Sequence, residues 1–323
     1  MGTSKWSERA NCWTSTVSPD PSSDQALVVE MLGLEALIRL APDAPSRRAL
    51  IRPGLRKKPG VVAGDWVTWK PVDEDADGPD ALITAVAPRE NLLSRPDFRG
   101  KPKPIAANLD YVVVVATPSD PPLRLGLVDR YLAAAAHNGI DAVVCLNKVD
   151  LDLDGSAQAQ LLPYARLCPV VTTSAVLETG IEALRRAVQG KRSVFVGHSG
   201  VGKSSLANAL IPGLDRRIGE VNDTIGRGRH TTTSARLLDL PGGGELVDTP
   251  GIRAFGLSGI DVRRLSELYP EFVERADDCR FRGCSHTHEP GCAVRPDVES
   301  GEIDRGRYER YVMIRQSILE EDF

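Results

Sequence analysis

The sequence predicts a multidomain protein made of a small β-barrel, an α/β domain with a parallel sheet, and a small helical domain rich in Cys and His. Three observations carry this prediction. Residues 33–105 contain short apolar stretches separated by Gly, Pro and charged residues, which is typical of a small barrel. In residues 106–258 apolar strands alternate with amphipathic helices, as in parallel sheets covered on both faces. Residues 259–323 combine helical stretches with a cluster of Cys and His.

The composition excludes several classes of protein. Hydrophobic residues make up 41% and charged residues 26% of the 323 residues, as in soluble globular proteins. The formal net charge of −4 excludes a uniformly basic nucleic-acid coat, so any RNA contact must come from a local basic patch. No apolar run approaches the roughly 18 residues that a membrane span needs, and residues 1–30 lack the apolar core of a secretory signal. We therefore expect a cytoplasmic protein that does not contact a membrane.

Residues 1–32 are rich in Ser and Thr but also carry acidic residues, and we expect them to form a flexible tail. The barrel follows this tail. Its strands are predicted at residues 34–40, 49–52, 61–62, 66–69 and 81–86. Basic residues concentrate at one loop of the barrel and its flanks: Arg47, Arg48, Arg52, Arg56, Lys57 and Lys58. This loop is the candidate patch for RNA.

The α/β domain is predicted in residues 106–258 from its apolar runs. Buried strands are expected at residues 111–116, 142–146, 169–172, 193–196 and 245–247. Helices are expected near residues 127–136, 181–188 and 203–210.

A phosphate-binding loop connects the strand at 193–196 to the helix at 203–210. This strand–loop–helix context is what the Gly-x-x-x-x-Gly-Lys-Ser motif requires. Backbone amides of such a loop wrap phosphates at a helix N-terminus. We expect Lys203 to reach the β- and γ-phosphate oxygens and the Ser204 hydroxyl to bind Mg²⁺. The residues expected to bind the phosphates are Gly197, His198, Ser199, Gly200, Val201, Gly202, Lys203, Ser204 and Ser205.

A second motif indicates that the base is guanine. Asn147, Lys148 and Asp150 follow the strand at 142–146, at the edge of the sheet where α/β proteins bind ligands. The Asp150 carboxylate can accept hydrogen bonds from the guanine N1–H and 2-amino group. Adenine lacks both donors, which argues against an ATP-using kinase or ATPase. The segment Thr173-Ser174-Ala175, after the next strand, supplies the usual accompanying guanine-contact loop.

The third element is Asp-Thr-Pro-Gly after the strand at 245–247. Asp248 is expected in the Mg²⁺ shell, and the Gly251 amide is expected to contact the γ-phosphate. The next residue is Ile252, where Ras-like enzymes have a Gln that orients the attacking water. His230, in a Gly- and Thr-rich segment, is the candidate catalytic residue because a neutral imidazole can hydrogen-bond water.

Two further Mg²⁺ ligands are candidates in the same segment. Thr231 or Thr232 is expected to supply the second protein oxygen, and the sequence does not choose between them. The cofactor is therefore Mg²⁺ bound together with GTP.

The order of these motifs is inverted, because the guanine motif precedes the phosphate loop. Ordinary GTPases present the phosphate loop first, so this is an α/β P-loop GTPase core that has been circularly permuted. The motif series resembles the family of circularly permuted GTPases that depend on the small ribosomal subunit, known as RsgA or YjeQ. The match covers residues 45–300 and includes Gly-Arg-Gly-Arg-His-Thr-Thr-Thr and Asp-Thr-Pro-Gly-Ile-Arg. The resemblance implies an N-terminal OB-fold, a C-terminal zinc domain, and catalysis by the His at the position of His230.

A metal cluster is predicted in the last domain. Cys279, Cys284, His286 and Cys292 offer three thiolates and one imidazole, which suit a tetrahedral Zn²⁺ with no open position. Such a site is structural and holds a segment too small to fold by packing alone. His288 is an alternative fourth ligand, and the family pattern favours His286. We therefore expect one structural zinc ion in a small zinc-binding helical domain.

The resemblance also implies a function. It implies a GTP hydrolase that acts late in the maturation of the small (30S) ribosomal subunit, with hydrolysis stimulated by that subunit. The expected partners are the small subunit with its 16S rRNA, and GTP or GDP, and the protein is expected to be a monomer. The alternative is a GTP-dependent rRNA-binding switch in which hydrolysis is incidental.

Overall fold

The computed structural model of the protein describes residues 24–42, 44–57, 59–72, 78–96, 102–214, 235–249, 257 and 260–321. His230, Thr231, Thr232 and Gly251 lie outside these residues. The chain divides into two compact units. One comprises Met1–Arg89 with Ser234–Leu237, and the other comprises Glu90–Thr233 with Leu238–Phe323.

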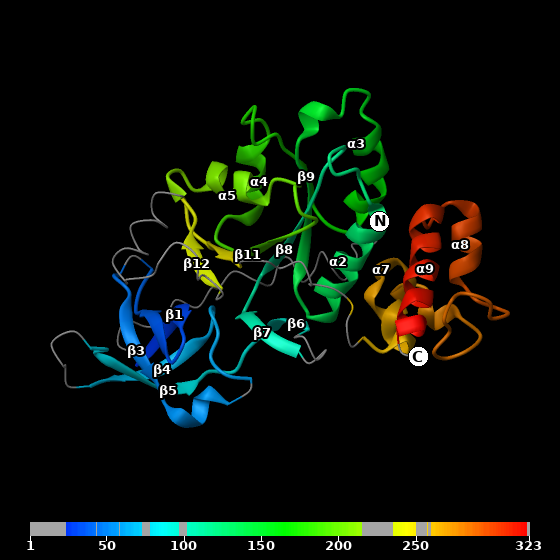
Figure 1. Cartoon of the computed structure of the whole chain (residues 1–323). Helices are drawn as coiled ribbons and strands as arrows, with labels where there is room; N and C mark the ends of the chain where they lie inside the picture. The colour runs from blue at the N-terminus through cyan, green and yellow to red at the C-terminus, as the bar shows by residue number, and fades with distance from the viewer. Residues whose placement is uncertain are drawn as a thin grey trace. The chain divides into compact units, whose positions relative to one another are not determined.

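The first unit contains a closed five-stranded barrel, drawn in blue in Figure 1. Its strands are β1 (Gln25–Leu32), β2 (Glu35–Arg39), β3 (Arg47–Ile51), β4 (Trp66–Pro71) and β5 (Ala81–Val86), and a short 3₁₀ helix, η1 (Pro53–Arg56), follows β3. They pair in the order β1-β2-β3-β5-β4, and β4 pairs back to β1, which closes the barrel. Alternate side chains such as Val28, Ile38 and Ile83 fill its core and are fully buried. The predicted OB-like barrel is confirmed.

The extent of the barrel differs from the predicted range. Strand β1 lies within residues 25–32, which the sequence assigned to the tail, because the run Ala26-Leu27-Val28-Val29 is buried against β2 and β4. The predicted strand at 61–62 is a turn, in which the Val62 amide donates to the Asp65 carboxylate at 2.8 Å. The chain beyond β5 leaves the barrel: β6 (Leu92–Pro96) and β7 (Pro102–Ala107) form a separate two-stranded sheet.

The second unit contains a parallel sheet of five strands. These are β8 (Tyr111–Ala116), β9 (Asp141–Leu146), β10 (Val170–Thr172), β11 (Arg192–Val196) and β13 (Glu245–Asp248), in the order β10-β9-β8-β11-β13. Strand β12 (Arg236–Asp239) precedes β13 through a tight turn. The continuous apolar sequence of β8 is typical of a strand buried on both faces.

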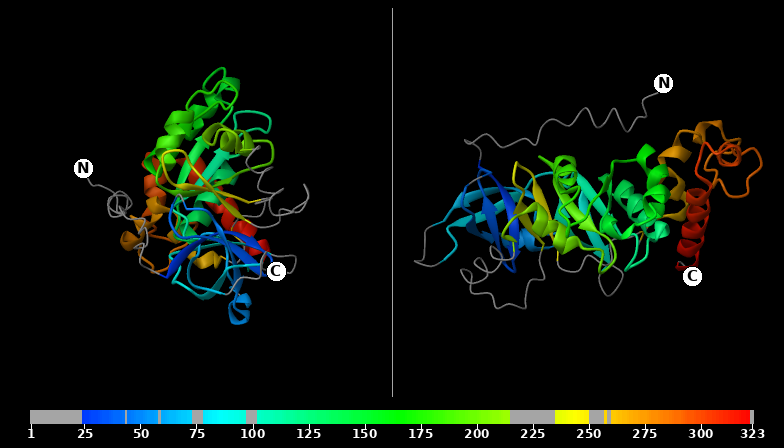
Figure 2. Two further views of the ribbon diagram at one scale, coloured as in Figure 1. Left: turned by 90° about the vertical axis from the view of Figure 1, so that its left-hand side faces the viewer. Right: turned by 90° about the horizontal axis from the view of Figure 1, so that it is seen from above.

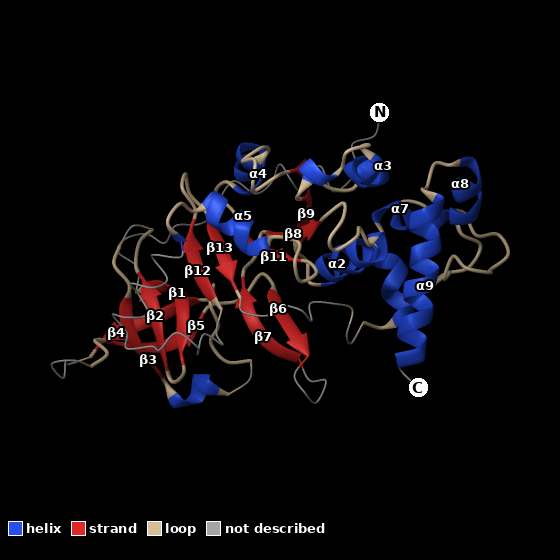
Figure 3. Cartoon of the chain, turned by 45° about the horizontal axis from the view of Figure 1, so that its top comes forward, coloured by secondary structure: helices blue, strands red, loops and turns tan. Residues whose placement is uncertain are grey.

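Helices cover both faces of this sheet (Figure 3). The helices are α2 (Leu125–His137), α3 (Ser156–Leu161), α4 (Ile181–Val188) and α5 (Lys203–Leu210), with short 3₁₀ segments η2 (Val149–Leu151) and η3 (Leu162–Arg166). Helices α4 and α5 pack on the face that carries Val113, Val143 and Phe195. Helix α2 packs on the opposite face.

The strand order indicates at which edge of the sheet a ligand would bind. The chain runs from β8 outward to β9 and β10, then returns to β11 on the other side of β8. Open α/β sheets bind ligands outside the carboxyl ends of their strands at such a point of reversal. The carboxyl ends of β8, β9, β11 and β13 therefore lie at one edge.

The C-terminal part of the second unit is helical. It contains η4 (Val262–Leu268), α7 (Pro270–Val273), η5 (Ala276–Asp278), α8 (Val294–Ser300) and α9 (Arg305–Glu321). Helices α8 and α9 are in contact, and the right-hand view of Figure 2 shows them next to each other. Its core is aromatic: Tyr269 stacks on Phe272 with ring centroids 5.1 Å apart, and Tyr311 meets Phe272 edge-on at 4.8 Å. Helix α9 packs against α2. No helix among the described residues has the length and apolar character needed to cross a bilayer.

Candidate nucleotide and metal sites

The predicted phosphate loop lies between β11 and α5 and depends on glycine. Gly197, Gly200 and Gly202 have φ values of 144°, 87° and 89°, which L side chains rarely adopt. A Cβ atom on Gly197 would lie 2.3 Å from the Val115 carbonyl oxygen of β8. Lys203 Nζ donates to the carbonyl oxygens of Gly197 and His198, at 2.9 Å each, so its ammonium lies at the loop. Ser204 and Ser205 are exposed at the start of α5.

Asn147 connects three loops of this edge. Its side-chain amide donates to the Val201 carbonyl of the phosphate loop at 2.9 Å. Its Oδ1 atom accepts from the Thr173 hydroxyl at 3.1 Å and from the Ala175 amide at 3.3 Å. The inverted chain order therefore still brings the predicted guanine motif, the Ser174–Ala175 loop and the phosphate loop together.

Beneath Asn147 the Thr173 hydroxyl has a second partner. Cys145 Sγ lies 3.3 Å from Thr173 Oγ1, and because that hydroxyl donates to Asn147, the thiol donates to it. Burial raises the pKa of the Cys145 thiol to about 12, so the proton needed for this bond is present at neutral pH. Thr173 belongs to the loop that the sequence assigned to guanine contact, whereas the sequence indicated no role for Cys145, whose position becomes meaningful only once β9 and β10 are paired.

Asp150 has the environment expected of a guanine-binding carboxylate. Its Oδ1 atom is buried, and no hydrogen-bond partner lies near it among the described residues. A buried acceptor without a partner is costly, so a ligand with N–H donors would satisfy it. Guanine offers such donors through N1–H and its 2-amino group. The residues present therefore fit this base.

Lys148 contacts the loop that connects β8 to α2. Its backbone is left-handed, with φ 59°, and its Nζ atom donates to the Asp120 carbonyl oxygen at 2.7 Å. The same loop is closed by the Thr117 hydroxyl, which donates to the Pro121 carbonyl at 2.7 Å. A Cβ atom on Gly200 would lie 3.5 Å from Pro121. The β8–α2 loop thus lies between the guanine motif and the phosphate loop, a contact the sequence did not indicate.

Asp248 ends β13, directly beside β11. The two strands are parallel, with Val194 opposite Val247, so Asp248 reaches the edge that carries the phosphate loop. This is where the sequence placed the Mg²⁺ ligand. The position of Asp248 and the exposed hydroxyl of Ser204 are compatible with a shared metal, and the candidates Thr231, Thr232, His230 and Gly251 lie outside the described residues.

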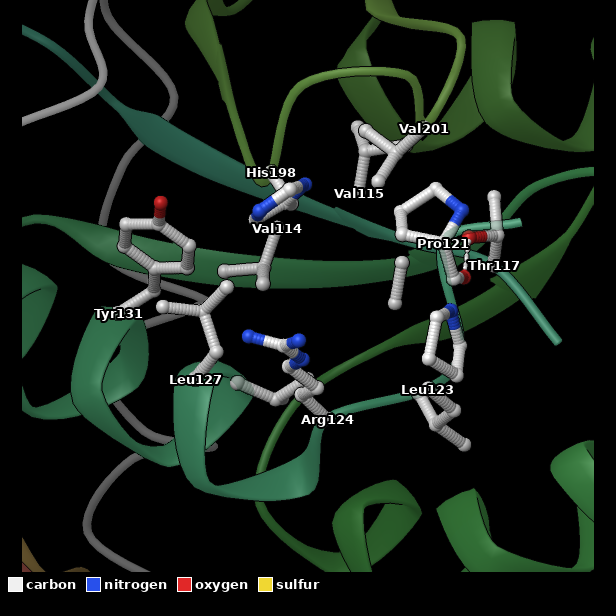
Figure 4. A pocket seen from close by; sticks show the side chains of 13 residues that line it. Val114, Val115, Thr117, Pro121, Leu123, Arg124, Leu127, Tyr131, His198 and Val201 are labelled. Atoms are coloured by element: carbon white, nitrogen blue, oxygen red, sulfur yellow. Dashed lines mark hydrogen bonds between the residues drawn. The ribbon is translucent and has the colours of Figure 1, made fainter. Parts of the chain in front are cut away.

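A pocket lies between the phosphate loop and α2 (Figure 4). His198 and Val201 of the loop face Leu127 and Tyr131 of α2 across it. Arg124, the residue before α2, contributes the charged side chain of the lining. Its walls are otherwise mostly apolar.

The predicted metal ligands form one cluster. The donor atoms of Cys279, Cys284, His286 and Cys292 all lie within 4.8 Å of one another. His286 presents Nδ1 to the cluster, 3.6 Å from Cys279 Sγ and 3.5 Å from Cys292 Sγ. His288 is exposed and its Nδ1 pairs with the Thr287 hydroxyl, so it is not part of the group. Three thiols and one imidazole fit a closed tetrahedral site.

Hydrogen bonds from neighbouring side chains hold the loop that carries the candidate metal ligands. The Glu289 carboxylate accepts from the backbone amides of Ser285, Thr287 and His288. The hydroxyl groups of Tyr308 and Tyr311 on α9 donate to the carbonyls of His286 and Ser285, respectively. Burial raises the pKa of the Cys284 thiol to about 12, so a metal must displace its proton on binding.

A parallel sheet with a phosphate loop after β11 and a guanine motif after β9, in inverted chain order, defines a circularly permuted GTPase. A family model described as RsgA GTPase matches residues 86–258. The chain belongs to the RsgA GTPase family, and the enzyme class predicted from the sequence is confirmed.

Curated relatives cover most of the chain. One, from Ectopseudomonas mendocina (strain ymp), is 44% identical over 270 residues, which are 82% of this chain and 77% of the relative. Another, from Pseudomonas aeruginosa (strain LESB58), is 42% identical over 300 residues, 92% of this chain and 86% of the relative. Both are named "Small ribosomal subunit biogenesis GTPase RsgA".

Solved structures show the same architecture. YjeQ from Thermotoga maritima matches with a TM-score of 0.76 and 33% identity, covering 91% of this chain and 98% of that one. YloQ, described as a circularly permuted GTPase, matches with a TM-score of 0.69 and 28% identity, covering 92% and 95%. The predicted combination of barrel, permuted GTPase core and Cys/His domain is therefore confirmed.

Proposed function

We propose that this GTPase acts late in the biogenesis of the small (30S) ribosomal subunit and hydrolyses GTP to GDP and phosphate while bound to it. The names of the curated relatives support this function, because the chain aligns with one of them over 92% of its own length. We further propose that the protein is a cytoplasmic monomer that contacts 16S rRNA.

The observation that carries the nucleotide assignment is the buried, unpartnered Oδ1 of Asp150. It lies three residues from Asn147, whose side chain is bonded to the phosphate loop. Asp150 would bind the guanine N1–H and 2-amino group, with Lys148 and the Ser174–Ala175 loop around the base. Residues 197–205 would bind the phosphates, with Lys203 moving from its carbonyl partners to the phosphate oxygens.

Hydrolysis requires a group that orients water. Mg²⁺, bound with GTP by Ser204, Asp248 and one of Thr231 or Thr232, would neutralise charge that develops on the phosphates. Ile252 stands where a Gln would orient water, and an aliphatic side chain cannot do so. We propose that His230 performs this role and that the Gly251 amide contacts the γ-phosphate.

The Cys/His cluster would hold one structural Zn²⁺. The donor set suits zinc. Its four protein ligands would leave no coordination position open for a catalytic water. RNA contact would come from exposed basic residues of the barrel, including Arg52, Arg56 and Lys57. Such contacts are electrostatic and strongly weakened by salt.

The test is the single-turnover GTPase rate with and without purified small subunits. Unassisted hydrolysis is expected to be slow, on the order of 10⁻⁴ to 10⁻² s⁻¹, and to rise when subunits are added. A rate that is the same in both conditions contradicts the proposal.

The same assay with His230→Ala separates the two candidate functions. Loss of the stimulated rate with retained GTP binding supports the catalytic assignment. Equal rates for the variant and the wild type would instead favour a GTP-dependent rRNA-binding switch in which hydrolysis is incidental.

A further inference from the structure

A charged residue is fully buried where α2 meets the C-terminal helices. Asp129, on α2, has an exposed fraction of 0%. Arg307 Nη1 of α9 donates to its Oδ1 at 2.6 Å, and the Tyr164 hydroxyl of η3 donates to the same oxygen at 2.7 Å. Arg310 of α9 donates to Oδ2. Both carboxylate oxygens are therefore satisfied by groups from other elements.

Arg307 extends this cluster into the C-terminal part of the chain. Its side chain is 5% exposed, and it also donates to the Glu271 carboxylate of α7. Its guanidinium lies over the Tyr269 ring, 4.6 Å from the centroid. Burial disfavours the charged form of Arg307, but the carboxylates of Glu271 and Asp129 outweigh burial and raise its pKa, so it remains charged.

The cluster fixes one orientation of the helices. Asp129 and Tyr164 belong to the nucleotide-binding core, whereas Glu271 and Arg307 belong to the C-terminal elements. Two helices could pack through apolar side chains alone, in several registers. A buried carboxylate that must meet two guanidinium groups allows only the arrangement that pairs it, since breaking such a pair leaves a charge buried alone.

Helix α2 also contacts the phosphate loop. Val128, the neighbour of Asp129, lines the pocket of Figure 4 together with Leu127 and Tyr131. His198 and Val201 of the phosphate loop form the facing wall. The loop that leads into α2 accepts a hydrogen bond from Lys148 through Asp120. Helix α2 thus faces the phosphate loop, the loop before it contacts the guanine motif, and α9 packs against the helix.

We infer that Asp129 is a positioning residue for the GTPase site: it fixes α2 to α9, so that nucleotide binding and the order of the C-terminal helices are coupled. The inference rests on the proposed assignment of residues 197–205 as the phosphate-binding loop. Coupling of this kind is reciprocal, since a ligand that stabilises one helix position is itself bound more tightly when that position is already fixed.

The test compares the full-length wild type with Asp129→Asn, which keeps the shape of the side chain and removes its charge. Hydrogen exchange of the α9 amides is measured without nucleotide, with GDP and with a non-hydrolysable GTP analogue. In the wild type we expect nucleotide to slow exchange in α9 by about fivefold or more. In Asp129→Asn this dependence should disappear, and the Kd for GDP should rise by about fivefold.

A matched control distinguishes positioning from plain loss of stability. Glu245 is partly buried and pairs at 3.2 Å with the buried Arg192, at the amino ends of β13 and β11. Glu245→Gln removes the same charge, and α9 exchange in this variant should keep its nucleotide dependence. If Asp129→Asn does not fold, Arg310→Gln provides a milder test: it removes one of the two guanidinium contacts of Asp129 and keeps the Arg307 pair, so the nucleotide dependence should weaken.

The outcomes separate this inference from the proposed function. If the wild type binds no guanine nucleotide, the proposed function itself fails. If it binds nucleotide but α9 exchange is unaffected, or if the Asp129 and Glu245 variants behave alike, the coupling through Asp129 is refuted. Loss of the dependence in the Asp129 variant alone supports it.

Discussion

Asn147 and Gly202 depend on each other within the nucleotide site. The Asn147 amide reaches the Val201 carbonyl only because the next residue has no side chain. A Cβ atom on Gly202 would lie 2.4 Å from Asn147 Nδ2, closer than real contacts allow. The second glycine of the phosphate motif is therefore needed for the link to the guanine motif as well as for the loop conformation.

Gly202→Ala should weaken guanine nucleotide binding. A left-handed alanine costs about 1–2 kcal/mol, and loss of the Asn147–Val201 hydrogen bond adds about 1 kcal/mol. Together these predict a rise of about 30- to 150-fold in the Kd for GDP, measured by titration with a fluorescent analogue. Gly155→Ala is the control, because Gly155 is also left-handed (φ 71°) but a Cβ atom there would have no neighbour within 4 Å. Equal affinities for the two variants would contradict the proposed link.

Asp150→Asn should change the base that is bound. An amide cannot accept from both the N1–H and the 2-amino group of guanine, whereas it can donate to the 2-oxo group of xanthine. We expect GTP affinity to fall by up to about 10⁴-fold and xanthosine triphosphate to bind in its place. Competition between the two triphosphates measures this change. A variant that still prefers GTP would show that Asp150 does not contact the base.

At the scale of elements, a buried ion pair ties the exit of the barrel to the turn before β4. Asp65, 0% exposed, accepts from Arg89 at 2.6 Å, and Arg89 also donates to the Gly60 carbonyl. Arg89 follows the last barrel strand by three residues. This pair fixes both the turn before β4 and the point where the chain leaves the barrel.

Arg89→Met should therefore destabilise the barrel strongly. Removing one partner of a buried pair costs about 3–5 kcal/mol, which urea unfolding monitored by Trp66 and Trp69 fluorescence would detect. Arg48→Met is the control, since Arg48 and its partner Glu35 are partly exposed, and such pairs contribute about 0–1 kcal/mol. If the free energy of unfolding fell by a similar amount in both variants, the buried pair would contribute no more to stability than the exposed one.

We expect the C-terminal elements to depend on the proposed zinc ion, because its four candidate ligands come from one short segment. Cys292→Ser should reduce bound zinc below one equivalent and expose residues 260–321 to proteolysis, because short helices around a metal lose their constraint without it. Zinc analysis and limited proteolysis measure these effects. Cys168, which is outside the cluster, provides the control, and Cys168→Ser should keep its zinc. Full zinc content in Cys292→Ser would argue against the proposed ligand set.

Much of the fold could be predicted from the sequence wherever local pattern decides the structure. The ranges 81–86, 111–116, 181–188 and 203–210 match β5, β8, α4 and α5 because their apolar periodicity is unambiguous. β1, β6, β7 and β12 were missed: β1 was counted with the tail, β6 and β7 contain Pro, which weakens a strand pattern, and β12 has only four residues. The metal cluster and the link from Asn147 to the phosphate loop could be foreseen from motifs. The Asp129 cluster could not, because its members come from four separated segments.

At the scale of the whole molecule, the described residues of the nucleotide site all belong to the unit that begins at Glu90. A chain that starts at Glu90 should therefore bind GDP with an affinity within about twofold of the full-length protein, because changes at distant sites add within about 0.5 kcal/mol. The same truncation should remove stimulation by small subunits if the barrel contacts RNA. A truncated chain that folds but binds no GDP would show that the barrel contributes to the nucleotide site.

The strand order β10-β9-β8-β11-β13 has a consequence for synthesis of the polypeptide. Strands β8, β9 and β10 are translated first and are consecutive neighbours, so each can pair with the one before it as it emerges. β11 and β13 are translated later and join the opposite side of β8. If Asp248 binds Mg²⁺ as proposed, a nascent chain would gain this ligand only after β13 has left the exit tunnel, so stable GTP binding would come late in synthesis.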